Sequence, residues 1–135
     1  MPVELDHLGI AVRSLKEALP FYRDMLGIEP AGAETVAAER VEVVMLPAGV
    51  GPGGARIELL EATDAQSVIA RFVEKHGPGL HHIAVRVDDL LSTVARLQAG
   101  GARLLNEPRQ GAGGHTYVFV HPASAGGVLL ELIQK

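Results

Sequence analysis

The sequence predicts an α+β fold made of two pseudo-symmetric βαβββ modules that form a curved mixed sheet. Alternating apolar residues, typical of half-buried strands, recur along the chain. The stretch DHLGIAVRSL (residues 6–15) is similar to HHIAVRVDDL (residues 81–90), and equivalent positions are 75 residues apart. Each copy has the pattern of a strand that leads into a helix, and a region rich in strand signals follows each helix.

Length and composition indicate a single domain, residues 1–135, that acts on small molecules. Its net charge is −4, and no basic cluster indicates nucleic acid or a membrane surface as a partner. The absence of cysteine excludes disulfides and thiolate metal ligands. The N-terminal stretch MPVELDH lacks signal-peptide features, and no apolar run approaches the roughly 20 residues of a membrane span, so we expect a cytoplasmic protein.

The first module is expected to cover about residues 1–64. After the strand in DHLGIAV, a helix begins at the capping-box pair Ser14 and Glu17 and ends before Gly27. Pro20 is expected to bend this helix, because proline removes a backbone hydrogen bond. Three strands should follow, near residues 34–37, 40–46 and 55–61.

A connecting helix, about residues 65–77, precedes the second module, about residues 78–135. The strand at residues 79–87 should lead into a helix that is capped by Asp88 or Asp89 and stopped by Gly100 and Gly101. The remaining strands are expected near residues 102–105, 116–121 and 127–133.

Two histidines occupy equivalent positions of the repeat, His7 and His82. Because side chains alternate along a strand, His7 shares a face with the small residues Gly9 and Ala11. The apolar faces should pack on the helices, which leaves both histidines on the opposite, concave side. His81 lies on the apolar face and is expected to be a core or interface residue.

Two carboxylates also form a pair, Glu58 and Glu131, 73 residues apart and each within an apolar strand. Burying a lone carboxylate is unfavourable by several kcal/mol unless it is paired or binds a cation. Two imidazoles and two carboxylates therefore predict a divalent metal site in a cleft of the curved sheet. The alternative is a set of ion pairs, Glu58 with Arg40 or Arg56, and Glu131 with Lys135.

Nitrogen and oxygen donors without a thiolate suit cobalt, nickel, manganese, iron or zinc. Four protein ligands on a six-coordinate ion leave two positions for a chelating substrate carbonyl. Glu42, flanked by valines in RVEVVML, is a candidate proton acceptor, because a carboxylate among apolar side chains is a stronger base near neutral pH. The alternative for Glu42 is a surface position on an edge strand, on the same face as Arg40.

These features resemble the vicinal oxygen chelate superfamily. Within it, GLHHIAVRVDDL, EPRQGAGG and HPASAGGVLLEL resemble the methylmalonyl-CoA epimerases over nearly the whole chain. The resemblance implies interconversion of (2R)- and (2S)-methylmalonyl-CoA through an enolate, by a homodimer that uses cobalt or a similar divalent ion. It implies that His7, Glu58, His82 and Glu131 bind the metal, and that Glu42 and Glu131 serve the two faces of the substrate carbon.

Two residues depart from that family pattern. Some members have glutamine where this chain has Glu58, so the site here is more negative. The family's HPKS reads HPAS, with Ala123 in place of a lysine that could hold the acyl-CoA. The loop GAGG, residues 111–114, resembles one beside the family's substrate entrance, and the alternative is a flexible hairpin.

Two other functions are consistent with the same fold. Glyoxalase I isomerises a glutathione hemithioacetal with a similar metal set, but its sites form between chains and its C-terminal motif is less similar. Ligand-sequestering relatives bind without metal and generally lack the four ligands.

Overall fold

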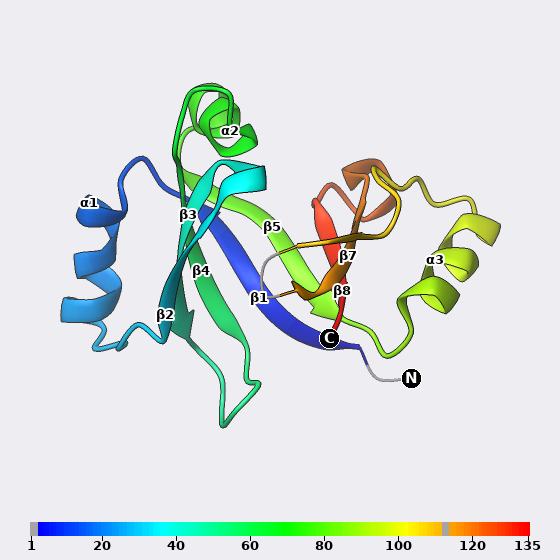
Figure 1. Cartoon of the computed structure of the whole chain (residues 1–135), viewed down its shortest axis with the longest axis horizontal. Helices are drawn as coiled ribbons and strands as arrows, with labels where there is room; N and C mark the ends of the chain where they lie inside the picture. The colour runs from blue at the N-terminus through cyan, green and yellow to red at the C-terminus, as the bar shows by residue number, and fades with distance from the viewer. Residues whose placement is uncertain (1–2, 112–113) are drawn as a thin grey trace. The chain divides into compact units, whose positions relative to one another are not determined.

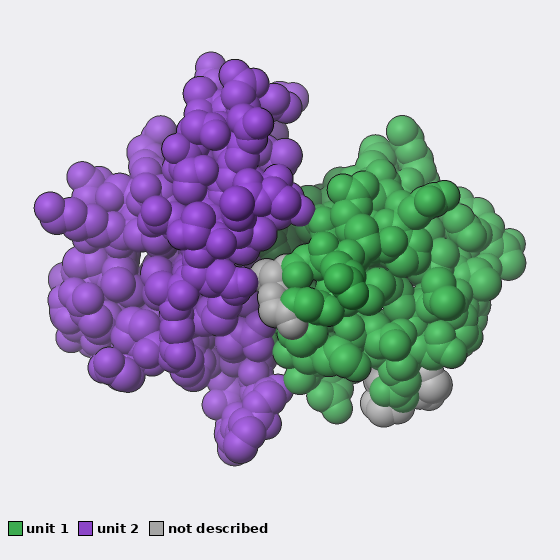
Figure 2. All heavy atoms as spheres, viewed as in Figure 1, with its two compact units in different colours: residues 1–6, 82–135 green, residues 7–81 purple. Residues whose placement is uncertain are grey.

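A computed structural model of the protein describes residues 3–111 and 114–135, and the chain divides into two compact units (Figures 1 and 2). Unit 2 contains residues 7–81, and unit 1 contains the described residues up to Asp6 together with residues 82–135. The chain therefore passes between the units twice, immediately before His7 and immediately before His82. As a result, strands β1 (Glu4–Ala11) and β5 (Gly79–Arg86) each contribute residues to both units.

Unit 2 contains the four strands expected of the first module. After β1 come β2 (Gly32–Val36), β3 (Val41–Pro47) and β4 (Arg56–Ala62). The strand order is β2-β3-β4-β1; β1 pairs with β4 in parallel, and the other neighbours are antiparallel. The continuous registers fix which side chains share a face, since directly paired residues point to the same side.

One face of this sheet, the α1 face, packs on helix α1 (Leu15–Pro20). Its buried core consists of Val12, Val44, Leu46 and Leu59. The other face, the His7 face, carries His7 and Glu58 toward one end and is covered at the other end by helix α2 (Val68–His76), through the side chains Ala11, Val41, Val43, Leu60 and Ile69. Both faces of β3 and β4 are therefore largely apolar, as the run VEVVML indicates.

The first helix follows the sequence prediction closely. The Ser14 hydroxyl accepts a hydrogen bond from the Glu17 amide (3.3 Å), and the helix continues past Pro20 as a π-helical turn, Phe21–Met25. Proline has no backbone N–H to donate, and the hydrogen-bond pattern of the helix changes from α to π at this residue.

Unit 1 repeats the arrangement with β5, β6 (Arg109–Gln110), β7 (Thr116–Val120) and β8 (Leu130–Gln134). The order is β5-β8-β7-β6, and β5 pairs with β8 in parallel while the other neighbours are antiparallel, which matches unit 2 strand for strand. Helix α3 (Leu90–Ala99) begins at Asp89 and covers the face formed by Val118, Val120 and Leu132. The prediction of an α+β fold with two βαβββ modules is confirmed.

Two predicted boundaries are wrong. Residues 102–105 form only an isolated bridge, between Leu104 and Val120, and the strand at that place in the module is the two-residue β6, where we predicted no strand. The last strand begins at Leu130 rather than Gly127. The expected entrance loop GAGG includes residues 112–113, which lie outside the described residues. Among the helices of the described ranges, none is both long and apolar enough to span a bilayer.

Candidate metal and acid–base site

The first imidazole–carboxylate pair lies in unit 2. His7 and Glu58 are 6% and 8% exposed, and His7 Nδ1 lies 3.3 Å from Glu58 Oε2. They meet because β1 and β4 are parallel neighbours and Gly9 is paired with Glu58. His7 lies two residues before Gly9 on β1, so its side chain is on the same face of the sheet as Glu58. The predicted proximity of these two residues is confirmed.

Arg56 is a third member of this cluster. Its Nη2 donates a 2.8 Å hydrogen bond to Glu58 Oε2, the same oxygen that lies near His7. The other cation considered for Glu58, Arg40, instead pairs with Asp64 at the surface (3.3 Å). The ion-pair alternative is thus correct for Arg56, although this pair leaves the imidazole beside the same carboxylate.

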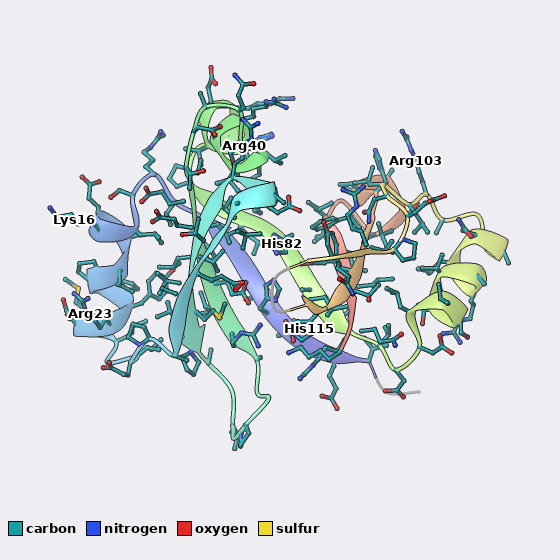
Figure 3. The ribbon with its side chains drawn as sticks, viewed as in Figure 1. Lys16, Arg23, Arg40, His82, Arg103 and His115 are labelled. Atoms are coloured by element: carbon teal, nitrogen blue, oxygen red, sulfur yellow. The ribbon has the colours of Figure 1, made fainter. Side chains whose placement is uncertain are left out.

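The second pair lies in unit 1. His82 is 7% exposed and projects from β5 (Figure 3), and its Nε2 lies 3.4 Å from Glu131 Oε1. The register pairs Ala84 with Glu131 and Phe119 with Glu131, so the pair shares a face with aromatic side chains. The Phe119 ring packs edge-on against the His82 imidazole, with 5.9 Å between ring centroids. This apolar wall limits the directions in which the imidazole can point.

Lys135, the cation considered for Glu131, contacts Asp6 instead, at 2.8 Å from Oδ1. Asp6 is 1% exposed and also lies 3.6 Å from Arg86, which in turn binds Glu4 at 3.1 Å. Two cations, Lys135 and Arg86, thus surround the buried Asp6, the residue that precedes His7. The sequence analysis missed this cluster, although an aspartate within an apolar strand was a visible signal.

His81 and His82 point to opposite faces of β5, because side chains alternate along a strand. Its ring packs edge-on against Phe72 of α2, with 5.0 Å between centroids, and burial lowers the pKa of the imidazole. The neutral ring is therefore favoured near neutral pH, as suits an apolar contact. His81 is half-buried against α2, which is consistent with the expected core or interface position.

Glu42 does not share a face with the His7–Glu58 pair. The register of β3 and β4 pairs Glu42 with Glu61 and Met45 with Glu58, so Glu42 lies on the α1 face and is exposed. The expected apolar surroundings of Glu42 are wrong, and the surface alternative is correct, because the alternation of β3 turns Glu42 away from the face that carries Glu58. Glu34, which is paired with Val43, is half-buried and lies on the His7 face.

Each pair offers one imidazole nitrogen and carboxylate oxygens, both largely shielded from water. These are donors that first-row divalent metals accept, and the chain has no cysteine that would favour soft ions. The donor atoms of each pair are therefore of the kind that fits a divalent metal ion.

Comparison with known proteins agrees with this chemistry. The family described as the Glyoxalase/Bleomycin resistance protein/Dioxygenase superfamily matches residues 6–119. Human mitochondrial methylmalonyl-CoA epimerase is 37% identical over 132 residues, which cover 96% of this chain and 73% of that protein. The ethylmalonyl-CoA/methylmalonyl-CoA epimerase of Cereibacter sphaeroides is 38% identical, and 96% of each chain is covered. The chain belongs to the methylmalonyl-CoA epimerase family within this superfamily.

A solved structure supports the same family. It is the structure of a methylmalonyl-CoA epimerase in complex with methylmalonyl-CoA and ammonium. The two structures match with a TM-score of 0.92 and 33% sequence identity, and the match covers 100% of this chain and 96% of the epimerase chain. The resemblance drawn from the sequence motifs is confirmed, and the epimerase family takes precedence over the glyoxalase I and ligand-sequestering alternatives.

Proposed function

We propose that this protein interconverts (2R)- and (2S)-methylmalonyl-CoA. The observation that carries the proposal is its similarity, over nearly its whole length, to epimerases that are named for this substrate. The buried imidazole–carboxylate pairs in both modules supply suitable groups for proton transfer at a carbon next to a carbonyl.

His7, Glu58, His82 and Glu131 are proposed to hold one divalent ion, with cobalt as the first candidate and nickel, manganese and zinc as others. The repeat makes the two pairs equivalent, and three of the four side chains are buried. When bound, the ion would act as a Lewis acid that stabilises the enolate form of the substrate.

The reaction needs one proton carrier on each face of the substrate carbon. Glu131 takes the proton when the C2–H bond breaks, and the electron pair moves into the thioester carbonyl. A second group then donates a proton to C2 from the opposite face, which inverts the centre. Glu131 is a carboxylate, the type of side chain that serves as a general base, and its side chain is only 14% exposed.

We assign the second proton carrier to Glu34 rather than to Glu42. Glu34 is half-buried and lies on the His7 face, whereas Glu42 is exposed on the α1 face. Glu34→Gln and Glu42→Gln form a matched pair of neutral, nearly isosteric changes on adjacent strands. We expect Glu34→Gln to lower kcat by at least about 100-fold, and Glu42→Gln to change it by less than about twofold.

Steady-state rates from both epimers check this assignment. A large loss in Glu42→Gln together with an active Glu34→Gln would return the role to Glu42.

The activity itself is tested by incubating the purified protein with (2R)-methylmalonyl-CoA and measuring the fraction of (2S) product. The parallel substrates are ethylmalonyl-CoA and the hemithioacetal of glutathione and methylglyoxal. Conversion of methylmalonyl-CoA to an equal mixture of epimers is the expected result. Isomerisation of the hemithioacetal alone would show a glyoxalase activity, and tight binding without turnover would show a sequestering protein.

A homodimer is part of the same proposal and is tested by analytical ultracentrifugation.

A further inference from the structure

Arg56 distinguishes the two imidazole–carboxylate pairs from each other. In unit 2, Glu58 Oε2 accepts a 2.8 Å hydrogen bond from Arg56 Nη2 and lies 3.3 Å from His7 Nδ1. The Glu58 side chain is 11% exposed and that of Arg56 is 23% exposed. The guanidinium therefore restrains one of the two carboxylate oxygens in a largely desolvated setting.

The repeat provides an internal comparison. The position in the second module equivalent to Arg56 lies 73 residues later and is Leu129. Glu131 still lies 3.4 Å from its histidine without a cation from that position. An arginine is thus not needed for such a pair to form in this fold, and Arg56 is an addition specific to Glu58.

We propose that Arg56 is a positioning residue for Glu58 as a metal ligand, an inference that rests on the proposed metal site. The guanidinium donates to Oε2, the carboxylate oxygen beside His7, and so restrains the rotation of the whole carboxylate. Carboxylate ligands are commonly held by such hydrogen bonds, and their loss weakens metal binding by about 10- to 100-fold. The positive charge also balances the carboxylate that stands here in place of the glutamine of some family members.

Two opposing effects decide the outcome of removing Arg56. Loss of the hydrogen bond frees the carboxylate to rotate and weakens metal binding, whereas loss of a nearby positive charge strengthens it. The Arg56 side chain is 23% exposed, so its charge is partly screened, whereas its hydrogen bond restrains a carboxylate that is only 11% exposed. We therefore expect the positioning effect to dominate.

The test is a double-mutant cycle read out by the affinity for Co²⁺, measured in competition with a chromogenic chelator. Arg56→Met should weaken Co²⁺ binding about 10- to 100-fold in the presence of Glu58. In the Glu58→Gln background the same change should alter the affinity by less than about threefold, because the neutral amide does not need the guanidinium. Arg56→Lys should restore part of the loss, since an ammonium group can still donate to Oε2.

Arg40→Met is the matched control, because it removes an arginine of the same unit whose partner is the surface residue Asp64. It should leave Co²⁺ affinity unchanged. The visible absorption of bound Co²⁺ should shift in Arg56→Met but not in Arg40→Met, because only the first change alters the geometry of the ligands. If Arg56→Met does not fold, Arg56→Lys provides the comparison.

Unchanged or tighter Co²⁺ binding by Arg56→Met, or equal losses in both backgrounds, would overturn the positioning role. Failure of the parent protein to bind Co²⁺ would overturn it together with the metal site. If the cycle shows the expected coupling between Arg56 and Glu58 but the protein does not epimerise methylmalonyl-CoA, only the proposed substrate is overturned.

Discussion

His82→Ala should lose its bound metal and at least about 1,000-fold of the epimerisation rate, whereas His81→Ala should keep both. The Lewis-acid contribution of a metal is several kcal/mol, and about 4 kcal/mol corresponds to this factor. The two histidines are adjacent in sequence but point to opposite faces of β5. His82 lies beside Glu131, and His81 packs on Phe72.

Metal content by mass spectrometry and turnover of the two variants provide the measurement. His81→Ala loses an aromatic contact and should be destabilised by about 1 kcal/mol, which a thermal melt detects. If both variants lose metal equally, the loss reflects a general disturbance of β5 rather than a ligand, and the assignment of His82 fails.

Glu131→Gln should lower the rate of epimerisation by at least about 100-fold. The variant should still bind Co²⁺, although more weakly than the parent protein. The amide oxygen can remain a ligand, but the neutral side chain cannot accept the proton from the substrate carbon. The substitution is nearly isosteric, and the backbone pairing of residue 131 with Phe119 does not depend on its side chain.

The decisive readout for Glu131→Gln is the rate at saturating metal, because it separates the loss of a base from the loss of a ligand. Glu58→Gln under the same conditions is the matched control, since its equivalent carboxylate is held by Arg56 and is assigned no proton transfer. Equal rates in the two variants at saturating metal would contradict the role of Glu131 as the proton acceptor.

The sequence repeat predicted the two modules and the two imidazole–carboxylate pairs. It identifies equivalent positions, and alternation along a strand shows which of those positions share a face. His7 and Glu58, and likewise His82 and Glu131, meet as expected. Short strand β6 escaped prediction because two residues, Arg109 and Gln110, carry no periodic signal.

The position of Glu42 could not be predicted for a physical reason. Strand β3 has apolar residues on both faces, since one face packs on α1 and the other on α2. Its valines therefore do not tell which residues share a face with His7 and Glu58. Only the register with β4 shows that Met45, and not Glu42, lies beside Glu58. Arg56 rather than Arg40 pairs with Glu58 because Arg56 and Glu58 lie two residues apart on β4 and therefore share a face.

The central claim is metal-dependent proton exchange at the carbon between the thioester and the carboxylate. We would incubate metal-stripped protein with methylmalonyl-CoA in heavy water, with and without added Co²⁺, and follow deuterium at C2 by mass spectrometry and the epimer ratio in parallel. The account predicts deuterium incorporation with inversion only when Co²⁺ is present. Folded, Co²⁺-loaded protein that incorporates no deuterium would contradict it.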